Sequence, residues 1–260
     1  MGDESVSSPG FEVLYEDGPC LAVAKPAGLP TQAPAAFESL ETRIRAFLAA
    51  RNDAAGPFAV PANPKSKIQN PKSVYLALPH RLDRPVSGAM IFATQRAAAR
   101  KLSRQFERRQ VKKIYWACVA GHVEPAAGTW HDRLWKIHGQ PRAMVVDETH
   151  PGGQQATLHY RTLGSSRFGS WLEIVLETGR THQVRVQAAS RGFTLLGDTH
   201  YGSQIPFGPQ HEDERRRAIA LHARQLTFFH PTTRLEFNVT APLPEAWQEL
   251  ELDPPGDVRL

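Results

Sequence analysis

Short apolar runs separated by turn residues recur along most of the chain, and they predict more strands than helices. Runs of strand length that are bounded by glycine, proline or other turn formers indicate strands. Such runs occupy residues 12–16, 20–24, 74–78, 89–93, 112–121, 143–146, 156–163, 171–177, 221–230 and 234–239. Apolar residues at helical spacing predict helices over residues 38–51 and 95–110, and a short helix over 244–250. A further helix is expected to start after Thr181, a suitable N-cap, and to run to residue 189.

Most of these elements are joined by short turns, and strands do not alternate strictly with helices. The pattern therefore predicts an α+β fold, with a mixed, mainly antiparallel sheet core and flanking helices. Residues 1–10 are polar and acidic and are expected to form a disordered tail, while residues 11–250 are expected to form one domain. The stretch 52–72, rich in Pro, Asn, Lys and Ser, predicts a surface loop. Residues 121–153 could separate two lobes, with a groove between them for an extended ligand.

Composition excludes several classes of protein. The first ten residues lack the apolar core of a signal peptide, and no later run approaches membrane-spanning length. Cys20 and Cys118 are far apart and show no spacing typical of a disulfide framework or a zinc site. Both are expected to pack as small apolar side chains. We therefore expect a cytoplasmic protein, monomeric, with no membrane association and no metal.

Charge adds one feature to this picture. The chain has 31 Lys and Arg against 26 Asp and Glu, and the distribution of the basic residues matters more than their excess. The predicted helix over residues 95–110 carries Glu107 as its only acid. Its basic residues are Arg96, Arg100, Lys101, Arg104, Arg108 and Arg109. A solvated face is the usual explanation for such a run, but a face that served only solubility would carry both signs. Both a solvated face and a phosphate-binding surface remain open.

One carboxylate stands out among the candidate chemical groups. Asp83 lies between Arg81 and Arg84, in a predicted loop between two strands. Nearby positive charge favours the ionised form of a carboxyl group, and an ionised carboxylate is a possible nucleophile. The alternative is a turn or capping residue that its neighbours neutralise. The local sequence does not decide between these two roles.

Four separated motifs carry a specific likeness to a known family. They are Lys25-Pro26-Ala27-Gly28-Leu29, then His80-Arg81-Leu82-Asp83-Arg84 with Ser87-Gly88, then Lys113-Ile114-Tyr115-Trp116-Ala117, and last residues 178–186 with Gly197-Asp198 and Tyr201-Gly202. In this order, and over residues 11–241, they resemble the RluA-type RNA pseudouridine synthases.

The resemblance implies an isomerase that converts a specific uridine of ribosomal or transfer RNA to pseudouridine by base flipping, without cofactor or metal. It implies that Asp83 is the nucleophile, that Tyr115 packs against the target base, and that Arg185 pairs with Asp83. It also implies that Arg81 enters the RNA where the target base leaves. With the basic residues of the chain, this gives an expected RNA-binding set of Arg81, Arg84, Lys112, Lys113, Arg180, Arg104 and Arg108.

The chain departs from the family pattern in two places. Pro85 and Val86 precede Ser87, where the family usually has a threonine directly before the serine. Only ten residues precede Phe11, so the additional N-terminal RNA-binding domain of many relatives is expected to be absent.

Two histidines and four tryptophans are expected to have structural roles. His80 and His182 are expected to form buried hydrogen bonds rather than to act in catalysis. Trp116, Trp130, Trp135 and Trp171 are expected in the core. The alternative functions are a non-catalytic RNA-binding protein that retains the fold, and an aspartate-dependent hydrolase. The joint presence of Asp83, Tyr115 and Arg185 favours the enzyme.

Overall fold

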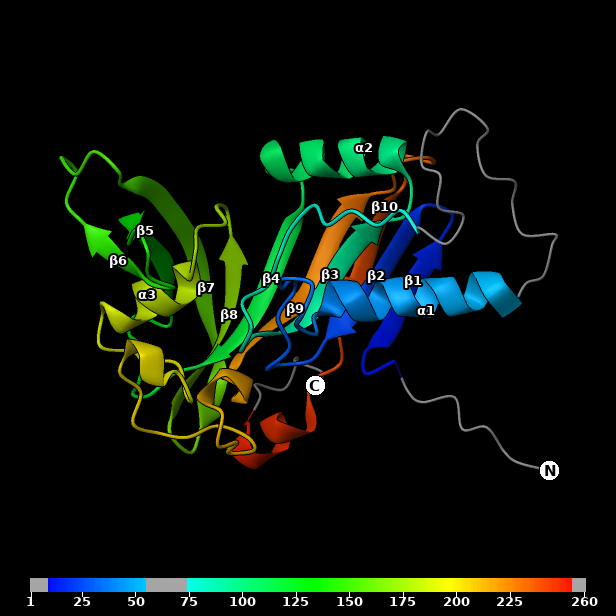
Figure 1. The fold of residues 1–260 in the computed structure, drawn as a ribbon. Helices are drawn as coiled ribbons and strands as arrows, with labels where there is room; N and C mark the ends of the chain where they lie inside the picture. Colours follow the sequence, from blue (N-terminus) through cyan, green and yellow to red (C-terminus); the bar gives the residue numbers. More distant parts are fainter. Residues whose placement is uncertain (1–8, 55–73, 254–260) are drawn as a thin grey trace, which may run out of the picture.

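A computed structural model describes residues 9–54 and 74–253, and its ten strands form a single sheet (Figure 1). The strand order is β1-β2-β3-β9-β4-β8-β7-β5-β6, and β10 pairs with β9 outside this path. The strands are β1 (Glu12–Asp17), β2 (Cys20–Lys25), β3 (Ser87–Ala93), β4 (Lys112–Cys118), β5 (Ala127–Lys136), β6 (Ala143–Val146), β7 (Gln154–Ser166), β8 (Gly169–Leu176), β9 (Leu221–Phe229) and β10 (Glu236–Thr240). The helical segments are α1 (Leu40–Ala54), α2 (Arg96–Glu107), α3 (Gln183–Ala189) and the 3-10 turns η2 (Thr199–Tyr201), η3 (Glu214–Arg216) and η4 (Glu245–Leu250).

The pairing of these strands confirms the predicted fold class. Among the named strands, only β3 and β9 run parallel, through Ser87 opposite His222 and Gly88 opposite Ala223. The other pairs are antiparallel. The sheet is therefore mixed and mainly antiparallel, with helices packed on it.

Alternation along the central strands places the helices on two faces of the sheet. Side chains of successive strand residues point to opposite faces. Leu21, Val23, Met90 and Phe92 pack in one cluster with α1 and α3 residues, whereas Cys20, Ala22, Ala89, Ile91 and Ala93 pack with α2. The face that carries α1 and α3 is therefore opposite the face that carries α2.

The core contains most of the residues expected there. Cys20 and Cys118 are free thiols and fully buried, which confirms that they pack as small apolar side chains. Trp116, Trp130 and Trp171 are also buried. Trp135 is only half-buried, so its expected place in the core is wrong.

Three expected elements differ from the structure. Residues 74–78 form no strand but one isolated bridge between Ala77 and Ala93. The reason is that the Arg45 guanidinium binds the carbonyl oxygens of Val74 and Leu76, at 2.7 and 3.2 Å, which a strand would use. The stretch 121–153, which could have separated two lobes, does not interrupt the sheet, because β5 and β6 extend it.

The third difference is the start of α3. The helix begins at Gln183, and Thr181 is not its N-cap. His182 holds that position with a left-handed backbone (φ +54°) and no side-chain cap. The Gln183 side chain instead fixes the turn before the helix, since its Oε1 accepts a hydrogen bond from the Arg180 N–H at 3.0 Å.

Some expectations fall on residues that the structure does not describe. Residues 1–8 of the predicted tail 1–10 and residues 55–72 of the predicted loop 52–72 lie outside the described ranges. Within residues 9–54 and 74–253, no helix is long and apolar enough to cross a membrane.

Gly88 joins the loop that holds Asp83 to β3, and no larger residue fits there. Its φ is +121°, and a Cβ would lie 2.3 Å from the carbonyl oxygen of Ala223 on β9. We predict that Gly88→Ala lowers the free energy of unfolding by about 2–5 kcal/mol, because backbone strain and a clash with rigid backbone add together. Urea denaturation measures this loss.

The control is Gly18→Ala in the turn between β1 and β2. Gly18 also has a positive φ, +50°, but nothing lies within 4 Å of its Cβ position. Only the backbone cost of about 1 kcal/mol is expected there. Equal losses in the two variants would show that contact with Ala223 is unimportant.

Candidate active site

A buried lysine holds the loop that carries Asp83 in place. Lys25, at the end of β2, is 1% exposed. Its Nζ donates hydrogen bonds to the carbonyl oxygens of Pro26 (2.9 Å), Leu29 (2.7 Å) and Arg84 (3.1 Å). Burial lowers the pKa of Lys25 to about 7, although the charge of Asp83 opposes this shift. The motif that contains Lys25 thus supports the motif that contains Asp83.

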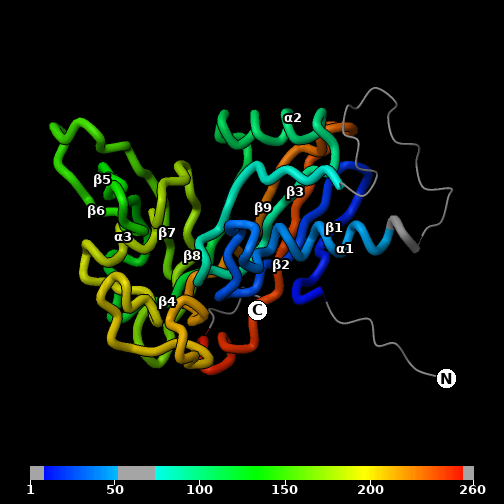
Figure 2. Tube along the Cα trace, viewed as in Figure 1, coloured from blue at the N-terminus to red at the C-terminus, as the bar shows by residue number. Residues whose placement is uncertain are grey.

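Three further hydrogen bonds fix the backbone of the loop at Leu82 and Asp83. The Thr31 hydroxyl donates to the Leu82 carbonyl oxygen at 2.8 Å, and the Leu82 N–H donates back to the same hydroxyl at 3.2 Å. The Val86 N–H donates to the Asp83 carbonyl oxygen at 3.1 Å, which closes a turn through Pro85. Segment 25–31 and the loop therefore lie side by side, as the trace in Figure 2 shows in blue and cyan.

His80 has the structural role that was expected. Its Nε2 accepts a hydrogen bond from the Ile91 N–H at 3.0 Å, and its ring stacks on Phe106 at 4.6 Å between centroids. Burial, followed by the charge of Lys113, lowers the pKa of His80 to about 3. The ring is therefore neutral at pH 7 and can act as the acceptor that this geometry requires.

Arg185 is the group that joins Asp83 to the rest of the site. It lies on α3, is 5% exposed, and its Nη1 is 3.4 Å from Asp83 Oδ2. Its shorter contacts are with Asp198, through Nε at 2.7 Å and Nη2 at 2.8 Å. Burial alone would lower the pKa of Arg185, but the hydrogen bonds and charge of Asp198, together with Asp83, raise it. The expected pairing with Asp83 is present, yet Asp198 is the closer partner.

A histidine and a tyrosine complete the surroundings of the carboxylate. His182 Nε2 lies 3.6 Å from Asp83 Oδ2, and His182 Nδ1 lies 2.8 Å from the Tyr201 hydroxyl. Burial lowers the pKa of His182 to about 4, against the attraction of Asp83, so the imidazole is neutral at pH 7. The Arg185 guanidinium also lies 5.0 Å from the centre of the Tyr201 ring.

Tyr115 faces the same place from β4. It is 9% exposed, and burial followed by the charge of Asp83 raises its pKa. Together with Asp83 and Arg185 it lines a small cavity of about 90 Å³, which Val86 and Leu221 also border. The three residues expected to act on the substrate are thus brought together in three dimensions.

Above this cavity is an open cleft of about 700 Å³. Arg81, Arg84, Arg185 and Arg215 line it, against the acids Asp83 and Glu214. Its positive charge suits a ligand that carries phosphate groups. Arg81 is exposed at this cleft, as a residue that contacts RNA would need to be.

The other basic residues of the expected set are distributed around the site. Lys113 is half-buried, and burial, followed by Arg109 and Arg180, lowers its pKa to about 8. Arg180 borders the small cavity. Lys112, Arg104 and Arg108 are exposed, but they line neither cavity that contains Asp83.

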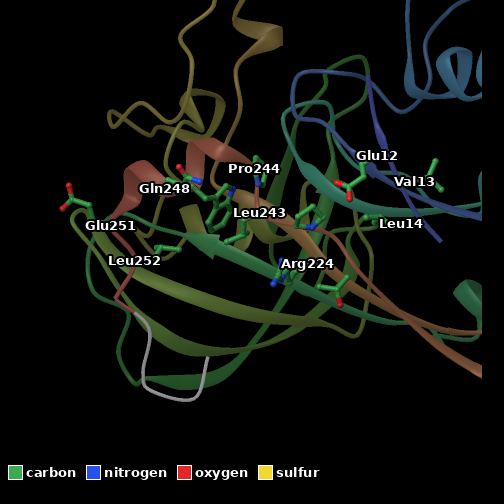
Figure 3. Close-up of a pocket in the computed structure, with 12 residues that line it drawn as sticks. Glu12, Val13, Leu14, Arg224, Leu243, Pro244, Gln248, Glu251 and Leu252 are labelled. Atoms are coloured by element: carbon green, nitrogen blue, oxygen red, sulfur yellow. The ribbon is translucent and has the colours of Figure 1, made fainter. Parts of the chain in front are cut away.

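A second, larger pocket lies away from Asp83 (Figure 3). It has a volume of about 860 Å³ and is bordered by Glu12, Arg224, Gln248 and Glu251, among others. The Arg224 guanidinium is held there by the Ala241 carbonyl oxygen at 2.6 Å and by the face of Trp116 at 4.5 Å. None of the residues expected from the sequence to act on RNA lines this pocket.

Sequence reasoning missed three residues that shape the site, namely Lys25, Asp198 and Tyr201, and for His182 it predicted only a buried hydrogen bond. All four residues lie in the motifs that carry the resemblance, which was the available signal. Their contacts could not be read from spacing, because Lys25 and Arg84 are 59 positions apart. Within the described residues, no group of three or more His, Cys, Asp or Glu side chains could hold a metal ion.

Comparison with known proteins agrees with this arrangement. The family model described as RNA pseudouridylate synthase matches residues 20–190. Ribosomal large subunit pseudouridine synthase D of Pseudomonas aeruginosa is 34% identical over 241 residues, which cover 90% of this chain and 69% of that protein. A Zymomonas mobilis protein named as an uncharacterized RNA pseudouridine synthase is 33% identical over 246 residues, or 92% of this chain and 96% of that protein.

A solved structure gives the same result. Human RNA pseudouridylate synthase domain containing 4 superposes with a TM-score of 0.69 at 25% identity, and the match covers 94% of this chain and 95% of that one. The fold and the site therefore define an RNA-modifying isomerase. The chain belongs to the RNA pseudouridylate synthase family and, by its motifs, to the RluA type.

The Arg185–Asp198 pair gives a test of how the site is held. We predict that Asp198→Asn lowers the free energy of unfolding by about 3 kcal/mol, because the buried guanidinium loses the full charge of its bidentate partner. Urea denaturation measures the loss. Glu38→Gln is the control, since Glu38 is 63% exposed and solvent screens its pair with Arg43, so that this pair should contribute little. Similar losses in both variants would contradict a special role for the buried pair.

Proposed function

We propose that this protein converts a specific uridine of a ribosomal or transfer RNA to pseudouridine, with Asp83 as nucleophile and with the target base flipped into the cleft. Residues 11–250 would form the catalytic domain. The observation that carries the proposal is the position of Asp83, at the floor of a basic cleft, with Arg185 at 3.4 Å and Tyr115 in the same small cavity.

The reaction needs one nucleophile and a closed place for a detached base. The Asp83 carboxylate attacks either C1′ of the sugar or C6 of the base. The N1–C1′ bond breaks, the base turns, and a C5–C1′ bond forms. The bond between the Asp83 carboxylate and C1′ or C6 breaks again, which returns the free carboxylate. The C5 proton is lost and N1 ends protonated, so the product has the same composition as the substrate and no co-reactant is consumed.

The neighbours of Asp83 have separate tasks in this proposal. Arg185, fixed by Asp198, orients the carboxylate through a charge-assisted contact. Tyr115 stays a neutral phenol and packs against the base, as aromatic side chains do with unstacked bases. His182 is a positioning residue. In the tautomer that accepts from the Tyr201 hydroxyl at Nδ1, its N–H at Nε2 faces Asp83 Oδ2.

The base must leave its stack to reach this cavity. Unstacking and unpairing cost a few kcal/mol, least where the target is already single-stranded. Arg81 is exposed at the cleft and its planar guanidinium can stack in the vacated position. Arg84, Lys112, Lys113, Arg180, Arg104 and Arg108 would contact phosphates on either side of the target.

Asp83→Asn tests the nucleophile directly. We expect pseudouridine formation to fall at least about 1000-fold, because a neutral amide cannot form the bond to carbon, while RNA affinity changes only a few-fold. Release of tritium from 5-tritiated uridine in RNA measures the turnover, and filter binding measures the affinity. Asp17→Asn, at the end of β1, is the matched control and should retain activity. Normal turnover by Asp83→Asn would refute the assigned role.

The RNA itself is identified by mapping pseudouridine in total RNA from cells with and without the gene. One or a few sites should disappear with the gene and return with the parent protein. Restoration by the Asp83→Asn protein would contradict the mechanism, and an unchanged map would contradict the proposed activity.

The role of α2 is tested through salt dependence. If Arg104 and Arg108 contact phosphates, replacing both with Ala should reduce the slope of log affinity against log salt by about 1–2, since each contact releases counterions. Arg161→Ala and Arg167→Ala, on the β7–β8 hairpin, form the matched control that removes the same charge elsewhere. Equal effects of the two pairs, or none, would mean that the basic face of α2 is only solvated.

A further inference from the structure

We propose that a pocket beside the catalytic cleft binds an unpaired nucleotide next to the target uridine, with Trp135 as its stacking surface. This inference rests on the proposed function and specifies its substrate. We call the site the hairpin pocket, because the β5–β6 hairpin forms much of it. It is bordered by Trp135, Lys136, His138, Gln154, Arg180 and Thr181, among others, and its volume is about 620 Å³.

Consecutive residues of the chain line the hairpin pocket and the cavities that contain Asp83. Thr181 borders the hairpin pocket, and the next residue, His182, borders both cavities that contain Asp83. Arg180 lines the hairpin pocket and the small cavity of Tyr115. An RNA strand with its uridine at Asp83 therefore has a neighbouring nucleotide within reach of the hairpin pocket.

Two backbone contacts fix this arrangement. The Arg180 Nε donates to the Gln155 carbonyl oxygen on β7 at 2.9 Å. The Tyr201 hydroxyl, which contacts His182, accepts a hydrogen bond from the Ala143 N–H on β6 at 3.0 Å. The Tyr201 hydroxyl thus connects Ala143, in the wall of the hairpin pocket, with His182, which lies beside Asp83.

The chemistry of the lining fits a nucleotide. Lys136 and Arg180 supply positive charge, and none of the lining residues is Asp or Glu. Gln154, Thr181 and His138 offer hydrogen-bonding groups of the kind that bind base edges. The volume is in the range of small-ligand pockets.

Trp135 differs from the other four tryptophans of the chain. Trp116, Trp130, Trp171 and Trp247 are at most 5% exposed, whereas Trp135 is half-buried and borders the hairpin pocket. Its ring lies 4.9 Å from the His150 ring, between centroids. A Cβ on Gly152 would lie 2.7 Å from Trp135 Cδ1, so the indole rests directly on the backbone there. A ring that is held in this way offers a preorganised surface for a base.

The pocket therefore favours a target uridine in a loop or bulge. Stacking of a base on an aromatic side chain requires that the base has left its own helix, and such stacking tolerates any of the four bases. The hairpin pocket would select for an unpaired neighbour rather than for a particular sequence.

Tryptophan fluorescence tests the proposal, since Trp135 is the tryptophan that borders the hairpin pocket. The probes are a single-stranded RNA of twelve mixed nucleotides, the same RNA in a fully paired duplex, inorganic polyphosphate and polyglutamate. We expect the single strand to quench the fluorescence of the parent protein and the other three to quench it weakly. Trp135→Phe should remove the quenching.

Affinity gives a second measure. Trp135→Ala should weaken binding of the single-stranded RNA by about 5–100-fold, the range expected for loss of one stacked base. Met144→Ala is the matched control on the same hairpin, because Met144 is 45% exposed and does not border the hairpin pocket. Circular dichroism of each variant checks that the hairpin is folded.

The outcomes separate this inference from the proposed function. Unchanged affinity of a folded Trp135→Ala protein, or equal quenching by duplex or polyphosphate, would overturn the stacking site and leave the role of Asp83 untouched. Stronger quenching by polyglutamate than by RNA would indicate an acidic protein partner instead. Pseudouridine formation by Asp83→Asn would overturn the proposed mechanism, whatever Trp135 does.

Discussion

The contact of the buried Arg185 guanidinium with two carboxylates is the interaction on which the site depends. Asp198 holds it in a bidentate pair, and Asp83 meets its remaining nitrogen at the edge of the cleft. A guanidinium that is 5% exposed would be unfavourable without such partners. The buried Arg185–Asp198 pair therefore sets the orientation of the Asp83 carboxylate.

Around this pair, burial favours the neutral forms of Tyr115 and His182, while the Asp83 carboxylate borders the cleft. The pKa of Tyr115 is raised and that of His182 is lowered to about 4, in both cases chiefly by burial. In the proposed function, the small cavity beside Tyr115 would hold the detached base, and the arginines of the cleft would contact phosphates. This division suits an isomerisation in which nothing but the base has to move.

The sequence allowed the fold class, most strands and the central residues of the site to be predicted, for identifiable reasons. β2 and β3 are almost entirely apolar because both of their faces are covered. β5 was missed because Asp132 occupies an inward position between the buried Trp130 and Leu134, which breaks the expected alternation. Gln187 and Arg191 bind that carboxylate, at 2.6 and 2.9 Å, and only the folded chain brings them there. The same limit applies to Asp198, whose importance depends on a partner that periodicity cannot identify.

The position of β9 has a consequence for how the chain is made. β3 and β4 follow one another in the sequence, separated only by α2, yet β9 lies between them in the sheet. The Asp83 loop enters β3 at the point where Gly88 meets Ala223 of β9. During synthesis, β3 and β4 therefore emerge with an open gap, and the sheet cannot close until residues 221–229 have left the ribosome. The nascent chain therefore cannot complete the surroundings of Asp83 before β9 has emerged, although β3 and β4 are made much earlier.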